Sequence, residues 1–250
     1  MFVAKYSASG NDFVIFHTLV KKERSNLAQK LCNRHDGVGA DGLVVVLPHS
    51  EYDFQWQFYN SDGSIASMCG NASRAVAHYA FIEGLAQSEA SFLTGAGVIK
   101  TSVQDDFVVS DLSKADVIEP LINEDENEWS LIDTGVPHLV RFTKSIEEFD
   151  LIQARKLRQK YNANVNIWTT KGEKIFVRTY ERGVEDETLA CGTGMAACFL
   201  QGVLSEKIST KVSAIAKSKE QLELEFVDGV IKFGGKVKRV FDAVVSENVL

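Results

Sequence analysis

The sequence predicts a mixed α/β protein made of two lobes of like fold. Three observations carry this prediction: many runs of alternating or β-branched residues, few segments with helical spacing, and a chemical pattern that occurs once in each half of the chain. The 250 residues suffice for two domains with cores of their own. We expect lobes at about 1–115 and 116–240, with the acidic segment 119–128, which contains Pro120, as the junction.

Strands are predicted wherever apolar and polar residues alternate or β-branched residues form short runs. In the first half of the chain these segments are 2–6, 12–18, 42–47, 54–59, 90–94, 97–103 and 106–111. In the second half they are 129–133, 138–142, 164–169, 174–180, 210–216, 221–226, 229–233 and 237–245. Asp228-Gly229 separates two of them and predicts a hairpin turn, because both residue types tolerate positive φ.

Helices are predicted in four segments, at 25–33, 71–84, 146–160 and 192–204. In the second and fourth segments, alanines and other apolar residues recur at helical spacing. Their small side chains suit helices that are enclosed by strands.

The two small-residue helices follow the same succession of features, which indicates an internal duplication. Tyr59 ends a predicted strand, a polar loop follows, and Cys69-Gly70 opens the helix, with the cysteine 10 residues after the tyrosine. Tyr180 ends another strand, and Cys191-Gly192 opens the second helix, with a separation of 11 residues. Two lobes of like fold explain this repetition.

Composition and charge narrow the class of function. The chain is 45% hydrophobic and 24% charged, and 27 basic against 34 acidic residues give a net charge of −7. Such a chain is not drawn to phosphate backbones or anionic lipid, so we expect no nucleic-acid and no membrane partner. The N-terminus lacks a basic and apolar leader, and the four cysteines form no CxxC pair. Both features predict a cytoplasmic, reducing location.

A cysteine at the start of a helix sits among backbone N–H groups without intrahelical partners, at the positive end of the helix dipole. This setting favours the thiolate, and the same N–H groups bind anions such as a carboxylate. The glycine after Cys69 and after Cys191 lets the backbone approach a ligand closely. If the two lobes face each other, one thiolate can remove a proton from a carbon while the other thiol delivers one to the opposite face.

The alternative for each cysteine is a small buried hydrophobe, the commonest fate of an isolated cysteine. The shared context of strand, loop, glycine and helix favours chemistry for Cys69 and Cys191. We assign Cys32 and Cys198 to the core. Among the five histidines His138 stands out, because a turn with glycine and proline precedes it and can aim its side chain.

Other motifs are weaker. The segment 37–42 has the glycine spacing of a dinucleotide-binding turn, but it follows a predicted helix and precedes a strand, which is the reverse order. We interpret it as a glycine-rich connection close to a ligand or a neighbouring strand. The cysteines lack the paired spacing of a zinc site, and no phosphate-binding loop or hydrolase motif occurs. We therefore expect neither a metal nor a cofactor.

The sequence resembles the diaminopimelate epimerases. The matching segments occur in order over nearly the whole chain. They are Ser9-Gly10-Asn11-Asp12-Phe13, Arg34-His35-Asp36-Gly37-Val38-Gly39-Ala40-Asp41-Gly42, Asn60-Ser61-Asp62-Gly63-Ser64, Met68-Cys69-Gly70-Asn71, Gly135-Val136-Pro137-His138, Asn164-Val165-Asn166, Glu181-Arg182-Gly183 and Ala190-Cys191-Gly192-Thr193-Gly194.

The resemblance implies two pseudo-symmetric lobes, each a mostly antiparallel curled sheet around a central helix, with the active site in the cleft between them. It places the first lobe at 1–115, with a final strand at about 240–250 returning to it, and the second lobe at 116–239. It also implies a cofactor-independent interconversion of LL-2,6-diaminopimelate and its meso form, in lysine and peptidoglycan precursor biosynthesis. The expected partner is a small amino-acid substrate. A homodimer is a possible oligomeric state.

Residue roles follow from the same resemblance. Cys69 would donate a proton and Cys191 accept one in one direction, with His138 and Glu181 beside the thiols. The residues expected to bind substrate hold either the reacting α-carboxylate at the helix starts or the distal polar groups. They are Gly70, Asn71, Gly192 and Thr193 for the carboxylate, and Asn11, Asn60, Asn166, Glu181 and Arg182 for the other groups.

Some positions depart from the usual family pattern. Ala72 stands where the family usually has glycine, and the loop 181–188 is one residue longer than its commonest form. Val136 stands where many members carry asparagine, and Gly42 stands where some carry glutamine. Ser7-Ala8 replaces a frequent His-Gly. None of these changes touches the two cysteines.

Three other functions are alternatives for such a sequence. A proline or hydroxyproline racemase typically has Cys-Gly-His at the first thiol, which Asn71 argues against. A racemase of another amino acid, such as histidine, would belong to the same superfamily. A catalytically silent amino-acid-binding protein would not need both thiols together with the Glu181-Arg182 pair.

Overall fold

The computed structural model describes residues 1–112, 115–219 and 221–246. The chain divides into two compact units. The first unit comprises Met1–Ser110 and Gly235–Leu250, and the second comprises Asp111–Gly234. The chain thus leaves the first unit and returns to it after residue 234.

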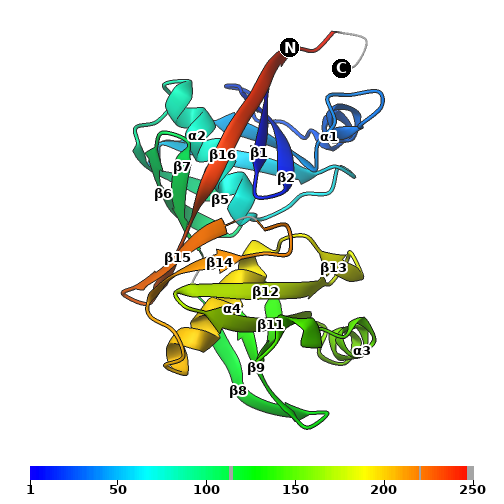
Figure 1. Cartoon of the computed structure of the whole chain (residues 1–250). Helices are drawn as coiled ribbons and strands as arrows, with labels where there is room; N and C mark the ends of the chain where they lie inside the picture. Colours follow the sequence, from blue (N-terminus) through cyan, green and yellow to red (C-terminus); the bar gives the residue numbers. More distant parts are fainter. Residues whose placement is uncertain (113–114, 220, 247–250) are drawn as a thin grey trace. The chain divides into compact units, whose positions relative to one another are not determined.

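Two helices and a set of short strands build the first unit (Figure 1). They are β1 (Phe2–Ala8), β2 (Asn11–His17), α1 (Ser25–Cys32), β3 (Gly42–Leu47), β4 (Phe54–Asn60), α2 (Gly70–Ile82), β5 (Glu89–Thr94), β6 (Gly97–Gln104), β7 (Phe107–Asp111) and the C-terminal part of β16 (Val230–Val244).

The second unit has a similar content. Its elements are β8 (Asp116–Glu124), β9 (Asn127–Asp133), β10 (Pro137–Phe142), the 3-10 turn η1 (Ile146–Glu148), α3 (Leu151–Tyr161), β11 (Asn164–Lys171), β12 (Lys174–Glu181), β13 (Asp186–Thr188), α4 (Gly192–Leu204), β14 (Lys211–Ile215), β15 (Gln221–Val227) and the first residues of β16.

The sheet of the first unit closes on itself. Its strands follow the order β1-β2-β3-β4-β5-β6-β7-β16, and β16 also pairs with β1. Two neighbouring pairs are parallel, β2–β3 and β4–β5, and they are connected through α1 and α2, as parallel neighbours require a crossover. Helix α2 contacts β1, β2, β3 and β6, so it is the helix around which the sheet curls.

The second unit repeats this plan. Its strands follow the order β15-β14-β12-β11-β10-β9-β8, with β13 beside β12. The parallel pairs are β10–β11, connected through α3, and β12–β14, connected through α4. Helix α4 contacts β9, β10, β11, β12, β14 and β15. The predicted mixed α/β class, with mostly antiparallel sheets around a central helix, is confirmed.

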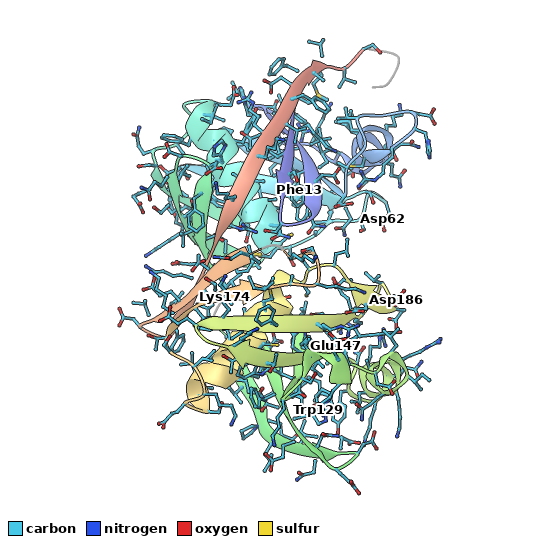
Figure 2. All side chains as sticks on the ribbon, viewed as in Figure 1. Phe13, Asp62, Trp129, Glu147, Lys174 and Asp186 are labelled. Atoms are coloured by element: carbon cyan, nitrogen blue, oxygen red, sulfur yellow. The ribbon has the colours of Figure 1, made fainter. Side chains whose placement is uncertain are left out.

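The central helices bury small residues. Ala72, Ala75 and Ala80 of α2 lie in one core cluster with the aromatic side chains of the strands, among them Phe13, which Figure 2 labels. Methyl groups on the helix leave room for the rings, so the sheet can wrap closely around it. None of the helices in the described ranges has the length and apolarity that a membrane crossing needs.

The acidic segment 119–128, predicted as the junction, is not the boundary between the two units, which falls between Ser110 and Asp111. It forms the hairpin of β8 and β9 inside the second unit. The sequence prediction missed β8 because its side chains are mostly exposed, with Ile122 the buried exception, and because it contains Pro120. The register of the pair shifts between Glu119 and Ile122, and such an irregularity is where a strand tolerates proline.

Other elements also differ from the prediction, among them the short strand β13, which lies in the segment expected to be a loop. The expected helix 146–160 is a 3-10 turn followed by α3, because the Asp150 side chain accepts hydrogen bonds from the N–H groups of Ile152 and Gln153 and starts a new helix there. The two expected strands 229–233 and 237–245 are one strand, β16. The hairpin turn before it is confirmed, with positive φ at Asp228 and Gly229.

Candidate active site

Cys69 and Cys191 each occupy the N-cap position of the central helix of their unit. Their backbones are extended, with φ −152° and ψ 122° at Cys69 and φ −131° and ψ 106° at Cys191. Their carbonyl groups accept the first helical hydrogen bonds, from Ser73 and Met195, both at 2.9 Å. Neither thiol caps its helix within the described chain, so each first turn keeps the N–H groups that form an anion site.

In the first unit, Asn71 links the start of α2 to the start of β2. Its Nδ2 donates to Oδ1 of Asn11 at 2.8 Å, and its Oδ1 accepts from the buried Arg74 guanidinium at 2.6 Å. Asn11 in turn donates to Asp41 at 3.0 Å, and Arg74 also donates to the Ser9 hydroxyl at 2.6 Å. The structure therefore brings Asn11 and Asn71 together next to the helix start.

Asn60 reaches the same group through Asp41. It ends β4 with an exposed side chain, whose Nδ2 donates to Oγ of Ser64 at 2.9 Å. The following residue, Ser61, donates its N–H to the Asp41 carbonyl at 3.0 Å. Asp41 therefore binds both segments: its carbonyl accepts from the loop of Asn60, and its carboxylate accepts from Asn11.

Two cations hold the residue that follows Asn11. Arg34 donates two hydrogen bonds to Asp12, at 2.9 and 2.8 Å, and Lys5 donates one at 2.7 Å. Burial raises the pKa of Asp12, but the bonds from Arg34 and Lys5 outweigh it and hold that pKa well below its usual range. Lys5 also donates to the Gly39 carbonyl. The glycine-rich connection therefore lies against a neighbouring strand, as predicted.

In the second unit, the buried imidazole of His138 joins two asparagines of β11. Its Nδ1 lies 2.8 Å from Oδ1 of Asn166, and its Nε2 lies 3.4 Å from Nδ2 of Asn164. An amide oxygen accepts and an amide NH2 donates, so these contacts fit the neutral ring with its proton on Nδ1. Burial lowers the pKa of His138 to about 4, which also favours the neutral form.

The two asparagines of β11 have different surroundings. Asn166 is fully buried, and its Nδ2 donates to Oγ1 of Thr179 at 2.6 Å, so both ends of its amide are engaged inside the unit. Asn164 accepts the N–H of Arg182 at 2.7 Å. Sequence reasoning selected Asn166 and passed over Asn164. Their spacing of two, which puts both on one face of a strand, was the available signal.

The start of α4 is fixed by threonines. Oγ1 of Thr193 lies 3.5 Å from the Cys191 sulfur, and the Thr193 carbonyl accepts from the Thr134 hydroxyl at 2.9 Å. Glu181 is half-buried at the end of β12, next to Arg182, and burial raises its pKa. The unit that carries Cys191 thus also carries six of the predicted site residues. They are His138, Asn166, Glu181, Arg182, Gly192 and Thr193.

The remaining cysteines lie in the cores, as predicted. Cys32 is 2% exposed at the end of α1, and Cys198 is fully buried on α4. Burial raises the pKa of Cys32 to about 12 and raises that of Cys198 well above its usual value. Burial therefore disfavours the thiolate form of both residues.

Solved structures of the same architecture define the fold class. A phenazine biosynthesis protein of the PhzF family from Bacillus anthracis matches with a TM-score of 0.72 and 14% identity, over 98% of this chain and 99% of that chain. A probable proline racemase from Agrobacterium radiobacter gives a TM-score of 0.74 and 14% identity, over 98% of this chain and 93% of that chain. The chain has the fold that these proteins share.

Sequence similarity identifies the family within this fold. The family model for diaminopimelate epimerase matches residues 3–118 and 130–237. The diaminopimelate epimerase of a Nitratiruptor species is 56% identical over 243 residues, 97% of each chain. The one of Helicobacter pylori is 45% identical over 263 residues, 98% of this chain and 96% of that one. The chain belongs to the diaminopimelate epimerase family.

Proposed function

We propose that this chain interconverts LL-2,6-diaminopimelate and meso-2,6-diaminopimelate by proton transfer between Cys69, Cys191 and one α-carbon, without a cofactor. The observation that carries the proposal is the duplicated helix start. Each cysteine is followed by glycine, stands at the N-cap position of a central helix, and occupies the same place in a repeated strand-helix-strand crossover. The family and its relatives support the substrate.

The proposed reaction moves protons only. The Cys191 thiolate takes the α-proton and becomes a thiol, while the C–H electron pair stays on the α-carbon. The Cys69 thiol then delivers its proton to the opposite face and becomes a thiolate. In the reverse direction the two cysteines exchange roles. This reaction requires the two units to bring their thiols to opposite faces of one carbon, which is part of the proposal.

The carbanion is the difficult species, because an α-proton beside a carboxylate is weakly acidic. We assign the reacting carboxylate to the first-turn N–H groups of α2 and α4, at Gly70, Asn71, Gly192 and Thr193. Donors that are fixed before the reaction stabilise developing charge without reorganisation. The helix dipoles add to this stabilisation.

In this proposal the enzyme recognises its substrate by the distal amino-acid group, the one that does not react. Asn11, Asn60 and Arg182 supply the polar contacts, and a substrate without that group leaves them unpaired. Glu181 remains the proposed carboxyl group beside the thiol. Since Asn166 and the neutral His138 are fully buried and bonded to each other, we assign both to positioning the start of α4.

The proposed product serves lysine and peptidoglycan precursor synthesis, and the reaction belongs in a reducing cytoplasm where thiols persist. A racemase of the proline type is not favoured, because the relatives at 45% identity and above are named diaminopimelate epimerases. The same comparison argues against a silent amino-acid-binding protein.

Single-thiol variants test the proposal in deuterated water. Cys69→Ala and Cys191→Ala should both lose epimerisation. Each should still exchange the α-proton of one stereoisomer, and the two variants should differ in which isomer they exchange, because one thiol remains on each face. Cys32→Ala is the matched control and should epimerise like the wild type. Normal epimerisation by either single-thiol variant would contradict the proposal, as would wild-type protein that incorporates no deuterium under reducing conditions.

A further inference from the structure

Arg74 is a charged residue in the interior of the first unit, and the proposed reaction gives it no role. It lies on α2, three residues after Asn71, and its side chain is 0% exposed. One of its nitrogens, Nη2, donates to Oδ1 of Asn71 and to Oγ of Ser9, both at 2.6 Å. Burying a charge is costly, and hydrogen bonds to it offset that cost. Arg74 therefore joins the start of α2 to the turn that precedes β2.

The contacts of Asn71 fix the orientation of its side-chain amide. An arginine side chain has hydrogens to donate and no acceptor, so the atom of Asn71 that faces Arg74 must be the oxygen. The Ser9 carbonyl lies 3.4 Å from Nδ2 and can only accept, so the atom that faces it must be the nitrogen. Two partners whose roles cannot change thus require the same orientation. In this orientation Nδ2 also donates to Oδ1 of Asn11, at 2.8 Å.

The same direction of hydrogen bonding continues through Asn11 to Asp41. Because Oδ1 of Asn11 accepts from Asn71, its Nδ2 is the atom that donates to the Asp41 carboxylate, at 3.0 Å. An ionised carboxylate only accepts, and Arg34 donates to its other oxygen at 2.8 Å. The chain of bonds therefore begins at a group that only donates and ends at a group that only accepts. Reversing either amide would place two donors or two acceptors against each other.

Arg74 also holds the turn that leads into Asn11. Ser9 and Gly10 connect β1 to β2 with positive φ, at 52° and 83°. A residue with a side chain is strained in this region, whereas glycine is not. The strained residue, Ser9, is held by its hydroxyl, which accepts from Arg74, and by its carbonyl, which accepts from Asn71. The backbone position of Asn11 and the orientation of its amide thus depend on the same guanidinium.

We propose that Arg74 is a positioning residue that holds the amide of Asn11 in the orientation that binds the distal group of the substrate. It acts through Asn71 and through the Ser9 turn, and it does not touch the substrate. Within the described chain, the second N–H of Asn11 Nδ2 has no partner and the residue is partly exposed, so this N–H is available to a ligand. The inference rests on the proposed function, in which Asn11 binds substrate. A contact made equally in the ground state and the transition state affects KM rather than kcat.

Steady-state kinetics with LL-2,6-diaminopimelate test this role. Arg74→Met should raise KM at least about fivefold, the equivalent of one hydrogen bond, and change kcat by less than about twofold. Arg74→Lys should keep the wild-type KM, because a single nitrogen makes both bonds. Arg24→Met is the matched control. Arg24 is also a buried arginine of the first unit, at 3% exposed, but its guanidinium donates to carbonyls of the loop before α1. Its loss should lower stability and leave KM unchanged.

The route through Asn11 is tested by a double variant. In an Asn11→Ala chain, Arg74→Met should raise KM no further, because the amide through which it acts is gone. Asp41→Ala probes the other, partly exposed end of the chain of bonds and does not depend on the folding of Arg74→Met. It should raise KM in the wild-type background and leave it unchanged in the Asn11→Ala background.

Nuclear magnetic resonance of the ¹⁵N-labelled chain gives a measurement that needs no substrate. The side-chain NH2 of Asn71 should exchange with water at least about tenfold faster in Arg74→Met than in the wild type, and at the wild-type rate in Arg24→Met. The proposal is overturned if this exchange is unchanged in Arg74→Met, if Arg24→Met raises KM as much as Arg74→Met does, or if the KM effect of Arg74→Met persists without the Asn11 amide. A wild-type chain that does not epimerise refutes the proposed function, whereas unchanged exchange in Arg74→Met refutes this inference alone.

Discussion

Gly194 allows the first turn of α4 to lie against a buried amide. A methyl group at this position would lie 2.4 Å from Nδ2 of Asn166 and 3.1 Å from Oγ1 of Thr179. Ordinary contacts begin near 3.4 Å, so in Gly194→Ala the Asn166 amide must retreat by 3.4 − 2.4 = 1.0 Å. A shift of that size disrupts its 2.6 Å bond to Thr179 or its 2.8 Å bond to His138.

The magnitude follows from what is buried there. Each hydrogen bond lost between buried groups costs about 1–3 kcal/mol, while alanine in place of glycine in a helix returns at most about 1 kcal/mol. We expect Gly194→Ala, which breaks one such bond, to lower the free energy of unfolding by about 1–2 kcal/mol. For a chain of this length that lowers Tm by roughly 2–8 °C, which calorimetry can measure.

A double-mutant cycle isolates the contact. Asn166→Ala removes the atom that the new methyl group would meet, so in that background Gly194→Ala should change the free energy of unfolding by less than about 1 kcal/mol. The reasoning is refuted if Gly194→Ala has the same effect in both backgrounds, or if it leaves the wild-type Tm unchanged.

Three further predictions concern titratable groups. Because burial lowers the pKa of His138 from 6.5 to about 4, its contribution to stability is complete above pH 6.5 and is lost as the pH falls toward 4, by up to about 3 kcal/mol. His138→Gln should flatten this part of the pH profile of denaturant unfolding. Cys32 and Cys198 should resist alkylation in the folded chain at about pH 8 and react after unfolding, as mass spectrometry can show. Asp12→Asn leaves the buried ammonium of Lys5 without its carboxylate and should lower the free energy of unfolding by about 3 kcal/mol; an unchanged denaturation midpoint would contradict this.

The sequence predicts those parts of the fold and of the candidate site that depend on near neighbours. The Cys-Gly pairs are recognisable because the N-cap, the first helical turn and the glycine are consecutive residues. The repetition of a strand, a loop and a small-residue helix is visible for the same reason. The hairpin turn at Asp228-Gly229 likewise needs two adjacent residues that accept positive φ.

The parts that the sequence does not predict depend on contacts between distant segments. Thr134 supports Thr193 across 59 positions, and Asn164 reaches both Arg182 and His138 across 18 and 26 positions. Hydrophobic periodicity carries no information about such polar contacts. The strand β8 was missed for another reason, since a mostly exposed strand lacks the alternation that marks a half-buried one.

The third residue of each central helix shows that the two duplicated helix starts are held by side-chain amides in different positions. Ala72 and Gly194 are equivalent positions, each three residues after its cysteine. Ala72 is fully buried in the core of the first unit. The amide that supports the helix start there belongs to Asn11 of β2, and it contacts the side chain of Asn71 instead of position 72. In the second unit the supporting amide of Asn166 comes from β11 and lies directly against position 194. A methyl group is therefore accommodated at 72, where it adds apolar contact, and excluded at 194, although both helices present the same Cys-Gly start.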